Sequence, residues 1–267
     1  LREYEACLTS LRQVFHTQPD DEQAAPSPVI LCGVVGAEKL GTGGLVLDYA
    51  EYLESLAARS GGTEVIQNDR KNRDSFYYNK QVEQFLHRAI DEDLFEVYYQ
   101  PIIDIQGGRD VCAGAEALIR WNSAKLGFIS PAEFIPLAEY LGLINPIGNY
   151  VLTEACTRCK RWNESGYPNY KVNVNLSVVQ LLQPDIVETV EKALADTGLS
   201  PKNLTLEVTE SLAINDMERM KEILNRIKSL GVSLALDDFG TGYSSLNHIR
   251  EIPIDVIKVD QSFVKDL

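Results

Sequence analysis

Short apolar runs alternate with longer amphipathic stretches along most of the chain. After residue 94, six runs predict strands, at 95–103, 113–121, 171–176, 204–209, from 233 onward and at 256–259. Before and between these runs, apolar residues spaced as on one face of a helix predict helices near 76–93, 131–141, 146–164, 177–198, 215–231 and 244–250. Strands that alternate with helices indicate an α/β protein with mainly parallel strands. An open doubly wound sheet and a (β/α) barrel both fit this pattern.

The N-terminal quarter of the chain has a shorter pattern of its own. It predicts a helix, a buried strand and a second helix, at about 1–18, 29–37 and 45–56. A charged stretch without apolar spacing follows and has the composition of a linker. We therefore predict three parts: a small α/β fragment at 1–68, a linker at 69–75 and a larger α/β domain at 76–267.

Composition narrows the partners and the compartment. A formal net charge of -14 argues against a nucleic-acid polymer as the partner, although a small anionic ligand remains compatible if a bound cation inverts the local field. The chain contains neither an apolar run as long as a membrane span nor a signal-peptide pattern. Five cysteines in 267 residues fit a reducing cytoplasm. The pair Cys156 and Cys159 falls within an amphipathic helix and has no second pair of ligands, so we interpret it as core.

Polar residues recur near the carboxyl ends of the predicted strands. Alternate residues of a strand face opposite sides of a sheet, and the apolar residues are expected to face the helices. One polar side chain from each of five strands then faces the other way: Glu116, Asn175, Glu207, Asp237 and Lys258. A barrel would gather these side chains at its mouth, where barrel enzymes assemble their sites. The alternative is a hydrogen-bonded polar layer that fills the barrel without performing chemistry.

The residue types predict a metal site for phosphoester chemistry. Three carboxylates and an amide oxygen suit Mg²⁺ or Mn²⁺ better than zinc. Asp238 is adjacent and could hold a second cation, although two acids after a strand also fit a turn that caps the next helix. Lys258 would orient the attacking water or stabilise charge on a phosphoryl oxygen. Arg120 would bind phosphate, or would be a surface arginine at a strand end.

Several motifs resemble the EAL family of cyclic di-GMP phosphodiesterases. They are YYQPI, AEALIRW around Glu116, VNVNLS around Asn175, LEVTES around Glu207, DDFGTGYSSL from Asp237 and IKVD around Lys258. The resemblance runs from about Phe95 to the end of the chain, with the motifs in the family's order. It implies a TIM-type (β/α) barrel and the hydrolysis of cyclic di-GMP to linear pGpG with Mg²⁺ or Mn²⁺.

The same resemblance implies roles for individual residues. Glu116, Asn175, Glu207 and Asp237 would be metal ligands, with Asp238 near the second metal. Lys258 would hold the catalytic water, and Gln100 and Arg120 would contact the dinucleotide. The loop that opens at Asp237 would couple the site to a homodimer interface. The family's barrel continues for about two more strands, so we expect the barrel to be incomplete in this chain and an upstream sensory domain to lie outside it.

Two further expectations complete the interpretation. The segment VILCGVVGA, the helix after it and GGTEVIQND are similar to the last third of a GGDEF domain, here degenerate because the GGDEF motif is absent. The alternative to a phosphodiesterase is a module that binds cyclic di-GMP as a sensor without cleaving it. An enolase-like lyase or isomerase would also combine barrel carboxylates, a metal and a lysine, but it predicts none of these motifs.

Overall fold

The computed structural model describes residues 43–59, 66, 69–92, 94–106, 110–209, 217–240 and 252–265. These residues belong to two compact units, Leu1–Val82 and Glu83–Leu267. The helix predicted at 1–18, the strand at 29–37 and the short helix at 244–250 lie outside the described residues. Within the described part, no helix combines the length and the apolar character that crossing a membrane requires.

The first unit contains α2 (Gly43–Arg59) and the beginning of α3 (Arg70–Asp91). Tyr49 and Leu53 of α2 are buried with Phe76 of α3, and the rings of Tyr49 and Phe76 meet edge to face, with centroids 5.0 Å apart. Helix α3 begins at Arg70 instead of 76, because the Asp69 carboxylate accepts a hydrogen bond from the Asn72 amide at 2.7 Å and caps the first turn. The predicted linker is therefore helical from Arg70 onward. The three-part division of the chain stays a prediction.

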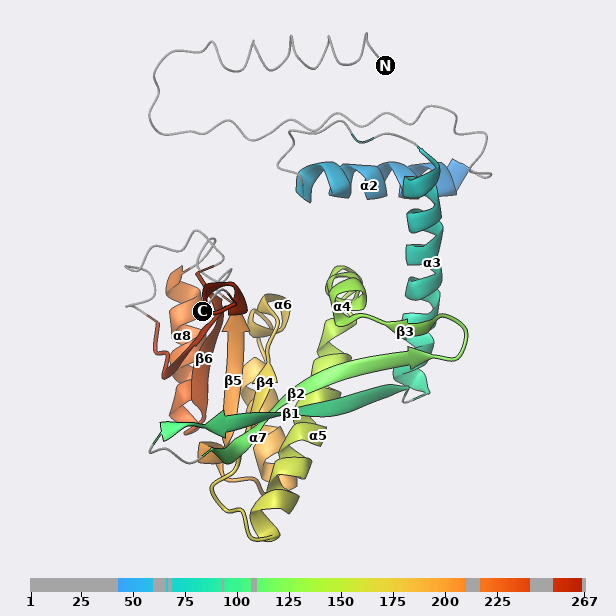
Figure 1. Cartoon of the computed structure of the whole chain (residues 1–267). Coiled ribbons are helices and arrows are strands. Elements are labelled where there is room, and N and C mark those ends of the chain that lie inside the picture. Colours follow the sequence, from blue (N-terminus) through green and yellow to red (C-terminus); the bar gives the residue numbers. More distant parts are fainter. Residues whose placement is uncertain are drawn as a thin grey trace, which may run out of the picture. The chain divides into compact units, whose positions relative to one another are not determined.

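The second unit is built on one sheet (Figure 1). Its strands are β1 (Phe95–Asp104), β2 (Val111–Ser123), β3 (Gly127–Ile129), β4 (Lys171–Asn175), β5 (Leu204–Thr209), β6 (Ser233–Phe239) and β7 (Val256–Val259). Their order is β1-β2-β4-β5-β6-β7, and β3 pairs with β2. Strands β2, β4, β5, β6 and β7 pair in parallel, whereas β1 is antiparallel to β2. The short connection between β1 and β2 permits a hairpin but not the longer crossover that a parallel pair needs.

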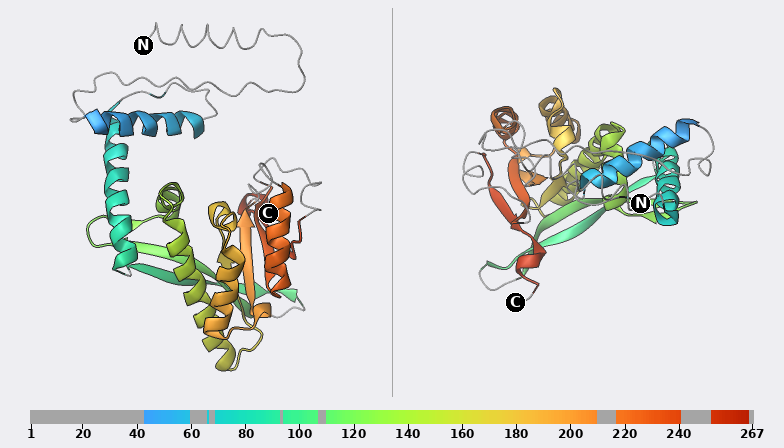
Figure 2. Two further views of the ribbon diagram at one scale, coloured as in Figure 1. Left: turned by 180° about the vertical axis from the view of Figure 1, so that it is seen from behind. Right: turned by 90° about the horizontal axis from the view of Figure 1, so that it is seen from above.

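Helices cover one face of the parallel strands. The helices of this unit are α4 (Pro131–Tyr140), α5 (Ile144–Glu164), α6 (Val178–Leu181), α7 (Ile186–Thr197) and α8 (Met217–Ser229), with short 3₁₀ helices at Pro201–Asn203 and Gln261–Phe263. Helices α5, α7 and α8 lie side by side over the sheet, as the view from behind shows (Figure 2). The predicted helical region before Gly198 is thus two helices, α6 and α7. The capping box at the start of α4 is present, with the Ser130 amide donating to Glu133 at 3.0 Å.

The core lies between this helical layer and the sheet. Apolar residues of alternate parity are buried on every central strand: Ala115, Ala117, Ile119, Val172, Val174, Leu204, Leu206, Val208, Leu234 and Leu236. Cys156 and Cys159 of α5 are buried free thiols, and burial raises the pKa of Cys156 to about 12. The prediction of an α/β fold with mainly parallel strands is confirmed: among the described residues the sheet is open, and helices cover one of its faces.

Gly114 provides a test of how closely β2 and β4 approach each other. A β-carbon at Gly114 would lie 2.0 Å from the backbone oxygen of Lys171, the residue with which Gly114 is in register on β4. Because backbone atoms cannot move aside without breaking the parallel pairing, we expect Gly114→Ala to lower the free energy of unfolding by about 2 kcal/mol or more. Chemical denaturation measures this change. The matched control is Gly44→Ala in α2, where a β-carbon meets no atom within 4 Å and the helix should tolerate it. Equal stability of the two variants would contradict the expectation.

Candidate active site

Three carboxylates from three strands meet on the face of the sheet that the helices do not cover, which we call the polar face. Glu116 of β2, Glu207 of β5 and Asp237 of β6 each place a carboxylate oxygen within 4.8 Å of the others. We call these three residues the acidic cluster. Their parity is the one expected from the sequence, since neighbours along each strand, such as Ala117, Leu206 and Leu236, are buried on the helical side.

Lys258 of β7 lies at the centre of the acidic cluster. Its Nζ is 3.0 Å from Glu116 Oε2, 2.6 Å from Glu207 Oε2 and 3.0 Å from Asp237 Oδ2. The side chain of Glu207 is completely buried, whereas those of Glu116 and Asp237 are each 18% exposed. Solvent therefore reaches the cluster from the side of Glu116 and Asp237, with Glu207 at its floor.

Two amides of β4 complete the site. Asn175 Nδ2 donates a hydrogen bond to Glu116 Oε1 at 2.7 Å. The Oδ1 oxygen of Asn175 takes no part in this bond and is a candidate metal ligand. Asn173 Nδ2 donates to Glu207 Oε1 at 2.6 Å. The sequence interpretation did not include Asn173 among the site residues. The signal was present, because Asn173 is two residues before Asn175 and so lies on the same face of the strand.

Burial and charge act against each other in the site. Burial raises the pKa of Glu207, and the nearby charge of Glu116 adds to this, while the hydrogen bonds from Lys258 and Asn173 oppose it. For Lys258, burial lowers the pKa, but the hydrogen bonds to Glu207, Asp237 and Glu116 raise it further than burial lowers it. Lys258 therefore remains an ammonium group, and it is the one cation in direct contact with three carboxylates among the residues described.

The donor set fits a divalent cation. Three carboxyl groups share a single ammonium, and a buried excess of negative charge is costly unless another cation offsets it. Carboxylate and amide oxygens are hard ligands, which Mg²⁺, Mn²⁺ and Ca²⁺ prefer. The exposed rim of Glu116 and Asp237 gives such an ion a route of entry. The acidic cluster is therefore chemically suited to hold a divalent metal.

Asp238 and Gly240 shape the end of β6. Asp238 has a positive φ of 55°, and its amide donates to Asp237 Oδ1 at 2.9 Å. Burial raises the pKa of Asp238, and the charges of Asp237 and Asp260 raise it further. Gly240 also has a positive φ, and a β-carbon there would lie 2.4 Å from the ring of Phe263. The predicted second-metal residue thus sits beside the cluster on a tightly turned strand end.

Gln100 and Arg120 lie on the β1–β2 hairpin, at the edge of the polar face. Gln100 is directly opposite Glu116 in the antiparallel pairing, so their side chains share this face. Arg120 follows Glu116 by four residues and so has the same parity, and its Nη1 donates to the backbone oxygen of Ile119 at 2.8 Å. The structure therefore places Gln100 beside the acidic cluster and Arg120 two same-face positions farther along β2. Their predicted contact with a dinucleotide stays a prediction.

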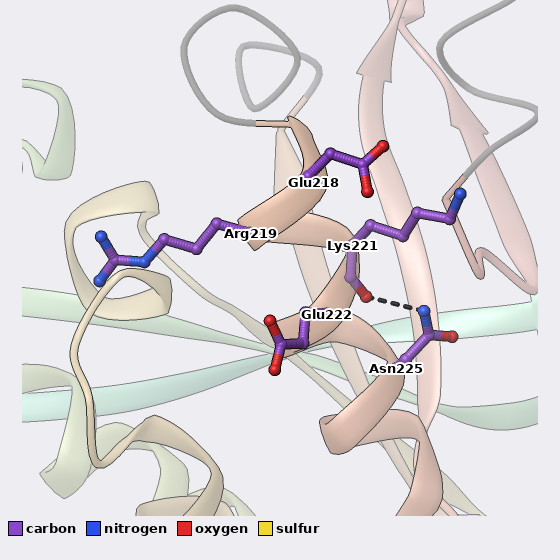
Figure 3. Close-up of a pocket in the computed structure, with 5 residues that line it drawn as sticks. All are labelled: Glu218, Arg219, Lys221, Glu222 and Asn225. Carbon is purple, nitrogen blue, oxygen red and sulfur yellow. Dashed lines mark hydrogen bonds between the residues drawn. The ribbon is translucent and has the colours of Figure 1, made fainter.

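A hollow lies along α8. It is lined by Glu218, Arg219, Lys221, Glu222 and Asn225 (Figure 3). Asn225 Nδ2 donates to the Lys221 backbone oxygen at 2.8 Å, a contact within the helix. All five residues belong to one helix and carry charges of both signs. Because groups from different elements do not converge there, this hollow has the character of a solvated helix surface.

Comparisons with known proteins agree on one family. The sequence model of the EAL domain matches residues 83–267. A similar relative is "Bifunctional diguanylate cyclase/cyclic di-GMP phosphodiesterase MucR" of Pseudomonas aeruginosa, 39% identical over 182 residues, which cover 68% of this chain and 26% of that protein. "Cyclic di-GMP phosphodiesterase NbdA" of the same organism is 38% identical over 187 residues, covering 70% of this chain and 24% of that protein. The chain spans about a quarter of the length of these curated relatives.

Solved structures agree with the sequence comparison. The structure described as "PaMucR Phosphodiesterase, c-di-GMP complex" superposes with a TM-score of 0.65 at 38% sequence identity, covering 70% of this chain and 74% of that one. The matched EAL region begins at residue 83, the residue at which the second compact unit also begins. The similarity to a GGDEF domain before that residue stays a prediction.

Proposed function

The chain belongs to the EAL family, and we propose that it hydrolyses cyclic di-GMP to linear pGpG in a reaction that depends on Mg²⁺ or Mn²⁺. The observation that carries this proposal is the acidic cluster: three carboxylates from separate strands within 4.8 Å of one another, on the face of the sheet that helices leave open. Relatives named as cyclic di-GMP phosphodiesterases, and a relative solved with this dinucleotide, support the choice of substrate.

In this proposal Glu116, Asn175, Glu207 and Asp237 hold the metal, and Asp238 helps to hold a second ion. When bound, such ions lower the pKa of a coordinated water and stabilise the leaving oxygen. Burial of Glu207 and its hydrogen bond from Asn173 keep the floor of the site rigid, so that the ligand oxygens need little rearrangement.

The remaining polar residues orient the reactants. Lys258, held by three carboxylates, directs its ammonium toward the position of the attacking water and opposes charge building on the phosphoryl oxygens. Arg120 binds a phosphate of the dinucleotide, because a guanidinium matches phosphate geometry with two donors. Gln100, opposite Glu116, hydrogen-bonds the substrate on the hairpin side. We also propose that the protein works in the cytoplasm and as a homodimer.

Incubation of the protein with cyclic di-GMP tests the proposal. We expect linear pGpG to accumulate with Mg²⁺ or Mn²⁺ and not after chelation with EDTA, and separation of the nucleotides by chromatography measures it. Equilibrium binding of the dinucleotide should be measured in parallel. Binding without turnover under any of these metal conditions would replace the enzyme with a cyclic di-GMP sensor, and the absence of both would overturn the proposal.

A further inference from the structure

Two adjacent tyrosines on β1 have different environments. Tyr98 and Tyr99 point to opposite faces, because neighbouring residues of a strand alternate. Tyr99 packs on the helical side, where its ring meets Trp162 edge to face with centroids 5.1 Å apart and its hydroxyl donates to the Glu154 backbone oxygen at 3.4 Å. Burial raises the pKa of Tyr99 to about 12. Packing on the helical side therefore explains the presence of an aromatic residue at position 99.

Tyr98 lies on the polar face and is 53% exposed. It is directly opposite Leu118 in the antiparallel pairing, so it lies between the Gln100–Glu116 pair and the position of Arg120. Successive residues of one face are about 7 Å apart along a strand. Tyr98 therefore lies beyond the acidic cluster by a distance comparable to the size of one nucleotide.

Arg120 makes contact with this ring. The centre of its guanidinium lies 5.8 Å from the centroid of Tyr98, within the range of a cation–π interaction. The interaction holds a phosphate-binding group over the edge of the polar face and restricts its rotamers. Because the Arg120 side chain is already restricted, less side-chain entropy is lost when a ligand binds to it. The ring of Tyr98 and the donors of Arg120 thus form one surface beside Gln100.

We propose that Tyr98 is a substrate-positioning residue, which holds the Arg120 guanidinium in place and stacks its exposed ring surface against a purine base of the dinucleotide. The inference rests on the proposed function. A purine has a flat π-face that stacks on aromatic rings, and its phosphate would then fall within reach of Arg120. One end of the dinucleotide would be held on the hairpin while a phosphodiester bond lies at the acidic cluster.

The test compares Tyr98→Phe with Tyr98→Leu in steady-state kinetics and in equilibrium binding of cyclic di-GMP. We expect Tyr98→Leu to raise both KM and Kd by about tenfold, since base–aromatic stacking and the hold on Arg120 are both lost. The value of kcat should stay within about twofold, because no group at the acidic cluster changes. Tyr98→Phe keeps the ring and should behave as the wild type. Tyr140→Leu is the matched control, a tyrosine of α4 that is 78% exposed.

A double-mutant cycle separates positioning from general destabilisation. If Tyr98 acts partly through Arg120, Tyr98→Leu should raise KM less in an Arg120→Ala background than in the wild type. Unchanged KM and Kd in Tyr98→Leu, or an equal loss in Tyr140→Leu, would overturn the inference while leaving the phosphodiesterase intact. A change of oligomeric state without a change in affinity would overturn it as well. A wild type that neither binds nor cleaves the dinucleotide would overturn the proposed function and the inference together.

Discussion

Asp237→Asn is expected to reduce the turnover of cyclic di-GMP by at least about 100-fold, and Glu116→Gln to do the same. Each substitution keeps the size of the side chain but removes one negative charge from the acidic cluster, so a divalent cation is bound more weakly and in a different position. Both side chains are partly exposed, and each keeps its neighbouring donors, Lys258 at 3.0 Å among them. The fold should therefore survive. Product formation at saturating metal, together with thermal unfolding, measures the two effects.

The matched control for this prediction is Asp196→Asn on α7. This aspartate is exposed and lies on the helical layer, so the same chemical change should leave turnover unaffected. Near-normal turnover by Asp237→Asn, with unchanged dependence on metal concentration, would show that Asp237 is not a metal ligand.

Lys258→Met is expected to produce two opposite effects. Turnover should fall by at least about 100-fold, because the group that orients the water and opposes phosphoryl charge is lost. The affinity of the protein for Mn²⁺, measured by calorimetry without substrate, should instead rise by about tenfold or more. In the wild type the ammonium contacts the same three carboxylates that would hold the ion, and a unit charge at such short range costs several kcal/mol at a partly buried site.

Two comparisons sharpen the prediction for Lys258. Lys192→Met removes an exposed lysine of α7 and should change neither turnover nor Mn²⁺ affinity. Lys258→Arg keeps the charge but not the compact ammonium, so it should restore little activity. If Lys258→Met lost turnover but bound Mn²⁺ no more tightly, the ammonium and the metal would occupy separate positions, and the lysine would act on the substrate alone.

Much of the sheet could be predicted because its strands carry simple patterns. The bounds of β5 and β7 agree with the expected runs 204–209 and 256–259, since each run is apolar on one parity and is bounded by polar residues. Two features could not be predicted in this way. Strand β3, at Gly127–Ile129, is too short for a periodic signal and exists because it pairs with the end of β2. The antiparallel direction of β1 depends on loop length instead of on strand composition.

The sequence could predict which polar side chains share one face of the sheet, but not the contacts that they make. Strand parity brings Glu116, Glu207 and Asp237 to one face, and the structure places them together. The position of Lys258 at the centre of all three depends on side-chain rotamers and on the curvature of the sheet, which a linear pattern does not contain. Asn173 and Tyr98 share the parity of predicted site residues, but an amide and an edge tyrosine are ordinary on any strand. Only their neighbours in space, Glu207 and Arg120, distinguish them.

The contact between Lys258 and Glu116 joins residues 142 positions apart in the sequence. Contacts of such long range cost more loop-closure entropy than a local hairpin such as β1–β2, so we expect them to form later during folding. Until β7 docks, the carboxylates of β2, β5 and β6 approach one another without the ammonium that offsets their repulsion. The last strand of the described sheet therefore supplies a charge that offsets this repulsion, and we expect its docking to contribute to cooperative assembly of the sheet.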